Sequence, residues 1–227
     1  MILPSQYYVE NLYPLQDGVM NTISKHGVQF FLTGGTALSR AYYNHRYSDG
    51  LDFFVNDDDD YSVQVIEVFS KLKEDGFFWD PGVDFISAKA FTSIKVSWDK
   101  SDTLLKLDFV NDVSSHFGEI IKTELFSRTD SIRNMLSNKI TALFRFTGKD
   151  VADIREIALR NEVDWAQAIQ DARQKEAVIE IPIVCDILQG IPQREFESIA
   201  WVNKPDWKEF RNDIDRIVHE MISGAPL

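Results

Sequence analysis

Three short segments in the first half of the chain carry residue types that phosphate chemistry uses. Gly34, Gly35 and Thr36 follow an apolar run. A glycine turn there would bring backbone N–H groups close to phosphate oxygens, and the threonine would add a hydroxyl at the start of a helix. Asp52 and Asp108 lie among large apolar residues, where a charge needs a partner. Such carboxylates on neighbouring strands suit Mg²⁺, so the segments together predict phosphoryl transfer.

Each segment also has an ordinary structural interpretation when it is taken alone. A Gly-Gly-Thr sequence can form a strand-to-helix turn that binds nothing, and a carboxylate can lie on the solvated face of a sheet. In the segment LKLDFV, Lys106 and Asp108 alternate with apolar residues and so share one face of a predicted strand. The combination of segments is therefore far more specific than any one of them.

Hydrophobic periodicity places these segments in a region of mixed helices and strands. Helices are predicted at 5–26, with interruptions at Pro14 and Gly18, at 37–43 and at 61–75. Strands are predicted at 28–32, 51–55, 85–90, 92–98 and 104–109, and the last three indicate an antiparallel meander. The glycine turn thus joins a strand to a helix, and both aspartates lie on strands.

The second half of the chain has a helical pattern from residue 130 nearly to the end. Asp164 with Gln167, and Asp206 with Glu209, resemble capping boxes, in which an aspartate caps a helix that carries Gln or Glu three residues later. The helices that they begin are predicted at 164–177 and 206–222. This half therefore forms a separate helical region.

The predicted fold class is α+β. An α/β domain with a mixed or antiparallel sheet flanked by helices is expected at 1–125, and a C-terminal helical lobe at 126–227. A chain of 227 residues with 44% hydrophobic and 26% charged residues can bury a substantial core. The single cysteine, Cys185, lies in an apolar segment and predicts a buried thiol.

The charge balance limits the partners of the chain. Twenty-four Lys and Arg residues against thirty-six Asp and Glu residues give a net charge of -12, which disfavours an extended DNA-binding surface. A few local cations could still bind a nucleotide or a polynucleotide end, and the acidity would suit a basic partner protein. No segment approaches the about 18 to 20 apolar residues of a membrane helix, and no leader pattern is visible, so the cytoplasm is the expected location.

Four segments together resemble the AbiEii/AbiGii abortive-infection toxin family, which belongs to the DNA polymerase β-like nucleotidyltransferase superfamily. They are FLTGGTAL at 31–38, HRYSDGLDFF at 45–54, NKITALFR at 138–145 and KDVADI at 149–154. The superfamily pattern is a Gly-Gly or Gly-Ser turn, two carboxylates two residues apart on a strand, and a third carboxylate on a later strand. The resemblance covers about residues 28–155 and implies a nucleotidyltransferase fold.

The resemblance implies a role for each matching residue in the first half of the chain. Gly34, Gly35 and Thr36 would bind the triphosphate. Asp52 and Asp108 would hold Mg²⁺, and Asp108 would also accept the proton of the incoming hydroxyl.

Other matching residues have less specific expectations. Lys139 would neutralise triphosphate charge, although it could also be a solvated helix lysine. Asp150 and Asp153 share a helix face, and they would orient Lys139, bind a second metal ion, or only favour the N-terminus of their helix. His45 and Arg46 would contact phosphate or base, or would be exposed loop residues.

Two residues depart from the family pattern. Position 50, where the first of the paired carboxylates belongs, is glycine, which weakens any two-metal site. Asp49 could replace the missing metal ligand only through a bulge or turn, because residues 50 and 52 share a face of a regular strand. Otherwise the protein is a degenerate nucleotide binder, or the gene carries an inactivating change. Lys149 stands where the family usually has Arg, which keeps the charge and loses the planar fork.

The function that the resemblance implies is transfer of a nucleoside monophosphate from an NTP to a hydroxyl, with Mg²⁺. The acceptor would be RNA, such as a tRNA 3′ end, or a protein. The protein would be the toxin of a toxin–antitoxin or phage-defence pair and would have a cognate antitoxin. The alternatives are a noncatalytic nucleotide-binding or interaction module, and a structural or regulatory protein with no nucleotide affinity.

Overall fold

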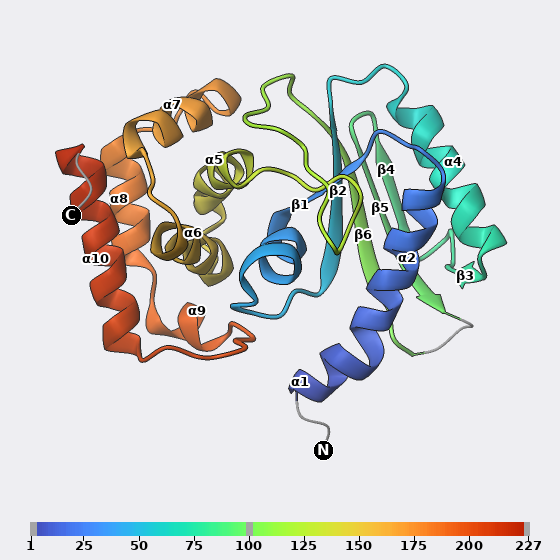
Figure 1. Ribbon diagram of the computed structural model, residues 1–227, viewed down its shortest axis with the longest axis horizontal. Coiled ribbons are helices and arrows are strands. Elements are labelled where there is room, and N and C mark those ends of the chain that lie inside the picture. The colour runs from blue at the N-terminus through green and yellow to red at the C-terminus, as the bar shows by residue number, and fades with distance from the viewer. Residues whose placement is uncertain (1–3, 99–101, 225–227) are drawn as a thin grey trace. The chain divides into compact units, whose positions relative to one another are not determined.

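The computed structural model describes residues 4–98 and 102–224. The chain divides into two compact units, Met1–Asp130 and Ser131–Leu227. The sequence pattern predicted the boundary between the two units at residues 125 and 126, five residues before the boundary in the structure. The first unit combines a sheet with helices and the second is helical (Figure 1), so the predicted α+β class is confirmed. No helix among the described residues is long and apolar enough to cross a membrane.

A six-stranded mixed sheet forms the centre of the first unit, in the order β1-β2-β6-β5-β3 with β4 paired to β5. The strands are β1 (Phe31–Thr33), β2 (Gly50–Asn56), β3 (Phe77–Phe78), β4 (Phe85–Ala88), β5 (Phe91–Trp98) and β6 (Leu105–Asp112). β2 and β6 are parallel, and the other neighbours are antiparallel. The predicted antiparallel meander is confirmed as β4, β5 and β6.

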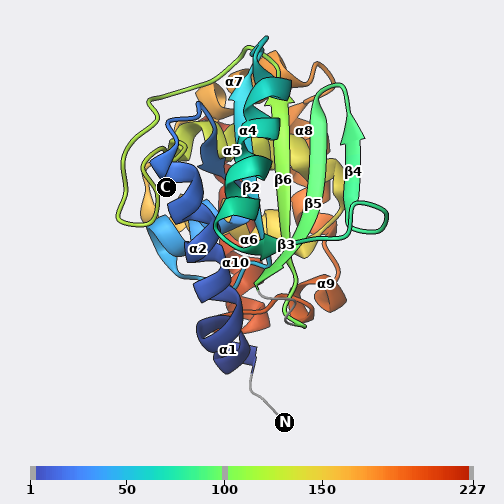
Figure 2. The same ribbon diagram turned by 90° about the vertical axis from the view of Figure 1, so that its right-hand side faces the viewer.

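The helices of the first unit are α1 (Pro4–Tyr7), η1 (Tyr8–Leu12), α2 (Tyr13–Lys25), α3 (Gly34–Thr36), η2 (Ala37–Tyr43) and α4 (Tyr61–Glu74). Figure 2 shows α4 in front of β2, with α2 beside α4. The last residue before the glycine turn, Thr33, ends β1, and α3 continues directly into η2. The predicted order of strand, turn and helix is therefore confirmed.

The predicted interruptions of the first helix differ from the structure. A π-helical turn, η1, precedes Pro14, which occupies one of the first two positions of α2, where the missing N–H is tolerated. Gly18 lies inside α2, and a Cβ there would come within 3.1 Å of Phe77 and Trp98. The prediction of a break at Gly18 is wrong, because this glycine permits close packing of the helix against two aromatic rings.

The strands of the first unit bury one face more than the other. Along β2, the buried residues Leu51, Phe53 and Val55 alternate with residues that are partly exposed. Leu107 and Phe109 continue the buried set on β6. Since successive side chains on a strand point to opposite faces, position 50 and Asp52 lie on the less buried face. The site described below lies on that face.

The second unit contains only helices. They are α5 (Ile132–Ala142), η3 (Leu143–Arg145), α6 (Gly148–Arg160), α7 (Trp165–Lys175), α8 (Ile181–Gly190), α9 (Gln193–Glu197) and α10 (Trp207–Ser223), with α8 and α10 side by side (Figure 1). The Asp164 carboxylate accepts from the backbone N–H of Gln167, and Asp206 accepts from those of Lys208 and Glu209. Both predicted caps are confirmed, and each such cap contributes about 1 kcal/mol.

Candidate functional site

A row of polar residues crosses four strands on the less buried face of the sheet. Thr33 on β1 pairs with Asp52 on β2, and Asp52 pairs in turn with Asp108 on β6. Asp108 pairs with Ser93 on β5. Directly paired residues place their side chains on the same face of a sheet. The structure thus brings the two predicted metal-binding carboxylates together as direct neighbours.

Two side chains hold the Asp108 carboxylate. The Ser93 hydroxyl donates to Oδ1 at 2.6 Å, and the Lys106 ammonium donates to Oδ2 at 2.6 Å. The Asp108 side chain is 17% exposed and that of Lys106 is 53% exposed. Asp108 therefore faces a partly open surface with its orientation fixed from two sides.

The glycine turn packs directly against Asp52. Gly34 has a φ of +70°, in the left-handed region that side chains disfavour, and a Cβ on it would clash with Oδ2 of Asp52. A Cβ on Gly35 would clash with the Arg46 guanidinium and lie 3.0 Å from the Ser48 hydroxyl. Gly34 therefore lets the backbone approach the Asp52 carboxylate in a conformation that side chains disfavour, and a side chain at position 35 would displace the Arg46 guanidinium.

Thr36 links the turn to the start of β2. Its side chain is fully buried, and its hydroxyl donates to the backbone carbonyl of Gly50. The hydroxyl that was expected to contact phosphate thus has a structural partner in this arrangement. The backbone N–H groups at the start of α3 are the remaining phosphate donors that this turn offers.

His45 and Arg46 are both buried, so the alternative that they are exposed loop residues is wrong. The Arg46 guanidinium lies against Gly35 and donates from Nη1 to the backbone carbonyl of Tyr47 at 3.0 Å. Arg46 is therefore brought to the glycine turn, as its predicted nucleotide-binding role requires.

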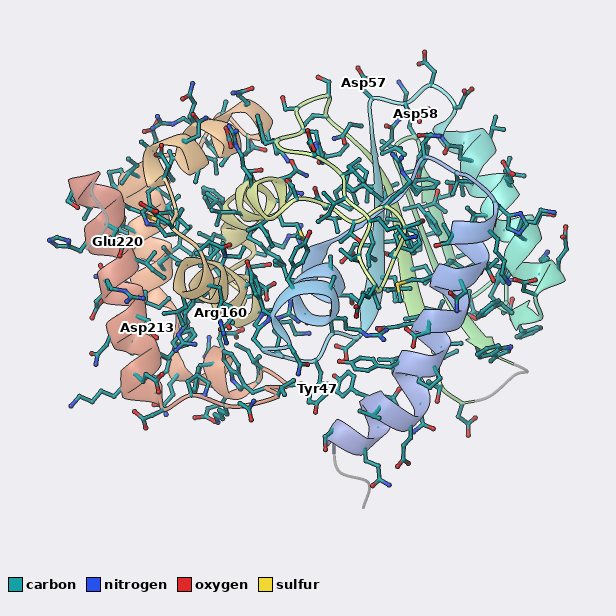
Figure 3. All side chains as sticks on the ribbon, viewed as in Figure 1. Tyr47, Asp57, Asp58, Arg160, Asp213 and Glu220 are labelled. Carbon is teal, nitrogen blue, oxygen red and sulfur yellow. The ribbon has the colours of Figure 1, made fainter. Side chains whose placement is uncertain are left out.

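Asp49 is held on the side of the N-terminal helices. The Tyr8 hydroxyl donates to Oδ1 of Asp49 at 2.5 Å. The Tyr8 ring stacks on the ring of Tyr47, which is labelled in Figure 3, with the ring centroids 4.4 Å apart. Burial, and then the hydrogen bond to Asp49, raise the pKa of Tyr8, so the phenol keeps the proton that it donates. β2 starts at Gly50 in the same register as Asp52, without a bulge. Of the two routes that were expected to make Asp49 a metal ligand, the bulge is therefore excluded for β2, and Asp49 lies directly before the strand.

Position 50 offers no side chain to this face, and it pairs with Lys106. A Cβ at Gly50 would lie 3.1 Å from the backbone oxygen of Lys106. Within residues 4–98 and 102–224, no group of three or more His, Cys, Asp or Glu side chains is placed to hold a metal ion. The acidic part of the site is therefore the pair Asp52 and Asp108.

Lys139 forms a buried ion cluster inside the second unit. Its ammonium lies 2.8 Å from Oδ1 of Asp150 and 2.7 Å from Oδ2 of Asp153, and the Thr147 hydroxyl donates to the other oxygen of Asp150. Its side chain is only 13% exposed, so the alternative of a solvated helix lysine is wrong. Among the open expectations for the two aspartates, the geometry favours orientation of Lys139.

Sequence reasoning missed four residues around the glycine turn. Asp130 is fully buried and accepts from the Thr33 hydroxyl at 2.6 Å. The His116 ring lies 3.0 Å from the other oxygen of Asp130, and Ser93 binds Asp108 as described. Only Thr33 gave a usable signal, because it directly precedes the glycines. The others come from distant segments whose register the sequence pattern does not specify.

The sequence and the fold of the chain are similar to those of known proteins. Residues 19–220 match the family model of the nucleotidyl transferase AbiEii toxin, type IV toxin–antitoxin system. JHP933 from Helicobacter pylori is 18% identical over 93% of this chain and 90% of that chain, with a TM-score of 0.66. MenT4, a nucleotidyltransferase toxin from Mycobacterium tuberculosis, is 13% identical over 93% of this chain and 82% of that chain, with a TM-score of 0.63. No curated protein matches the sequence. The resemblance drawn from the four sequence segments is confirmed.

Proposed function

Since the chain belongs to the family of AbiEii nucleotidyl transferase toxins, we propose that it transfers a nucleoside monophosphate from an NTP to a hydroxyl group of an RNA or protein acceptor. The observation that carries this proposal is the direct pairing of Asp52 with Asp108 beside the Gly34 turn. The turn offers backbone donors for phosphate, and the carboxylates offer oxygen ligands for a hard cation. Both lie within the first unit.

The donor set fits one Mg²⁺ ion. Mg²⁺ is commonly bound by one or two carboxylates together with substrate phosphates, and Asp52 and Asp108 supply two neighbouring carboxylates. A bound Mg²⁺ would neutralise triphosphate charge and polarise the phosphorus–oxygen bonds. A two-metal centre does not fit, because position 50 has no carboxylate and Asp49 bonds to Tyr8.

Residues of the chain would accept the proton of the acceptor hydroxyl and bind the triphosphate. Asp108 would accept the proton of the attacking hydroxyl, with Ser93 fixing its orientation. Gly34 and Gly35 would present backbone N–H groups to the triphosphate, and Arg46 would support the turn or bind phosphate. The role of Lys139 in neutralising triphosphate charge rests on the family resemblance, and within its own unit this lysine is oriented by Asp150 and Asp153.

Labelled nucleotides test the proposal. The protein is incubated with each α-labelled NTP, Mg²⁺, and either total RNA or a protein fraction. We expect label on one acceptor class, and a loss of about a hundredfold or more in Asp52→Asn, which keeps the size of the side chain and removes its charge. Asp49→Asn is the matched control, because the same change at that position leaves the carboxylate pair intact. Equal transfer by Asp52→Asn and the parent would contradict the proposal.

A noncatalytic nucleotide-binding module is the second candidate, and Gly50 is the observation that favours it. The variant Gly50→Asp separates the two functions. Transfer by this variant but not by the parent would contradict catalysis by the parent, and analogue binding by the parent would then support the noncatalytic module. The Cβ of the new side chain would need a shift of a few tenths of an ångström from the Lys106 carbonyl, so circular dichroism must first confirm that the variant is folded.

The family also implies a partner. We propose that a cognate antitoxin counteracts the protein. The gene of this antitoxin can be found by coexpressing each neighbouring gene with the toxin. The net charge of -12 suits a basic partner. Growth arrest on expression of the chain alone, relieved by one neighbouring gene, is the expected result.

A further inference from the structure

A second row of paired residues lies beside the carboxylate row on the same face of the sheet. Gly50 on β2 pairs with Lys106 on β6, and Lys106 pairs with Lys95 on β5. This row is two residues away from Asp52 and Asp108 along each strand, so its side chains also point to the face of the site. The acidic row thus has a basic neighbour in the place where a further carboxylate was expected.

The Lys106 ammonium is directed at the site and not away from it. It lies 2.6 Å from Oδ2 of Asp108, although 53% of the lysine side chain is exposed and other orientations in solvent are open to it. The ammonium therefore contacts one of the two carboxylates of the proposed metal site. A positive charge therefore lies beside Oδ2 of Asp108.

The glycine at position 50 affects the carboxylates that the Lys106 ammonium can contact. A Cβ at Gly50 would lie 3.8 Å from the Cβ of Lys106, so any side chain there would extend alongside the lysine. An aspartate at position 50 would present its carboxylate to the same ammonium. With glycine at position 50, the Lys106 ammonium forms its ion pair with Asp108.

The formal charges of the two possible centres are equal. Three carboxylates with two Mg²⁺ ions carry one net positive charge. Two carboxylates with one Mg²⁺ and one ammonium also carry one net positive charge. Loss of a carboxylate together with a metal ion is therefore balanced by a single lysine, and a triphosphate would meet the same total charge in both cases.

We propose that the Lys106 ammonium is the second cation of the site, so that the chain binds an NTP with one divalent metal ion instead of two. This inference rests on the proposed function, because it concerns the same nucleotide site. Lys106 would contact Asp108 before the nucleotide arrives and would lie beside the triphosphate once it is bound. It acts by charge and requires no change in protonation.

The number of metal ions per bound nucleotide tests the proposal. Mn²⁺ is used as the probe, and its bound fraction is measured by electron paramagnetic resonance in the presence of α,β-nonhydrolysable analogues of the four NTPs. We expect one Mn²⁺ per bound nucleotide in the parent protein. Two Mn²⁺ ions per bound nucleotide would overturn the proposal.

Nucleotide affinity supplies a second readout with a matched control. Lys106→Met keeps the length of the side chain and removes its charge, and Lys95→Met makes the same change one strand further from Gly50. We expect analogue binding to weaken roughly tenfold in Lys106→Met and by no more than about twofold in Lys95→Met. Both lysines are exposed, so both variants should fold, as thermal unfolding will verify.

The outcomes separate this inference from the proposed function. If the parent binds none of the analogues, both proposals fail. If the parent binds an analogue and Lys106→Met binds it as tightly, or if the two variants weaken binding equally, only the role of Lys106 is overturned.

Discussion

At the scale of single residues, Gly34 is the position where the site tolerates least change. Its φ of +70° and the closeness of Asp52 are two separate obstacles to a side chain. We predict that Gly34→Ala lowers the free energy of unfolding by about 2 to 4 kcal/mol and displaces Asp52, which weakens nucleotide binding. Urea unfolding and analogue titration measure the two effects.

Gly27 is a control for the backbone part of this effect. Its φ is +68°, but a Cβ there would have no neighbour within 4 Å. Gly27→Ala should therefore lower stability by only about 1 kcal/mol, which is the cost of the left-handed conformation, and should leave binding unchanged. Equal losses in the two variants would show that contact with Asp52 does not matter.

Tyr8 decides whether Asp49 can serve the metal site. The phenol holds the Asp49 carboxylate through a hydrogen bond, which Tyr8→Phe removes. We predict a loss of about 1 kcal/mol in stability and no change in Mn²⁺ affinity, because β2 has no bulge that would turn Asp49 towards Asp52. Tighter Mn²⁺ binding by Tyr8→Phe would restore Asp49 as a metal ligand.

At the scale of secondary-structure elements, the ion cluster between α5 and α6 links a predicted catalytic lysine to the stability of its own unit. The side chains of Asp150 and Asp153 are buried, and the Lys139 ammonium forms an ion pair with each of them. We predict that Lys139→Met lowers the free energy of unfolding by about 3 kcal/mol, since it removes the ammonium that is bonded to both buried carboxylates.

The double variant Lys139→Met with Asp153→Asn separates this structural effect from any role with nucleotide. It should recover part of the stability, because one of the two uncompensated charges is gone, and it should not recover nucleotide binding. Lys208→Met, on the exposed side of α10, is the control for loss of a lysine and should change stability by less than about 0.5 kcal/mol. Full recovery of binding would show that Lys139 acts only on stability.

The elements show which parts of the fold the sequence could specify. The alternation of Leu107 with Lys106 and Asp108 predicted both the strand and the face that the lysine and the aspartate share. Asp164 and Asp206 marked the starts of α7 and α10. These signals are local. The break expected at Gly18 was wrong, because the reason for that glycine is its contact with rings from β3 and β5, which no local pattern reveals.

The parts of the site that could not be predicted depend on register between strands. Asp52 and Asp108 were expected on neighbouring strands, but their direct pairing follows from the parallel register of β2 and β6. Alternation along the strand was enough to predict that Lys106 shares a face with Asp108. The pairing of Lys106 with Gly50 could not be predicted, because it depends on the register of β2 and β6. Asp130 and Ser93 reach the site through long-range contacts and carry no motif of their own.

At the scale of the whole molecule, buried tyrosines make the stability of the protein depend on alkaline pH. Burial raises the pKa of Tyr13 and of Tyr42 to about 12, and it also raises that of Tyr8; all three residues belong to the first unit. The unfolded chain ionises its tyrosines near pH 10. The stability due to these groups is therefore fully present below about pH 10 and is lost as the pH rises towards about 12.

Urea unfolding at a series of pH values, followed by tyrosinate absorbance, checks this prediction. We expect the free energy of unfolding to fall between about pH 10 and 12. Tyr13→Phe should make the fall shallower, because phenylalanine has no proton to lose. The same free energy at about pH 9 and about pH 11 would contradict the prediction.

The central position of β6 in the sheet has a consequence for synthesis of the protein. β6 is the last strand made, yet it lies between β2 and β5, and it carries Asp108 to Asp52. A growing chain cannot complete this sheet until the ribosome has passed residue 112, and contacts between distant segments form slowly. Nascent chains that stop before β6 therefore lack the carboxylate pair, so a truncated translation product of this toxin should be harmless to the cell that makes it.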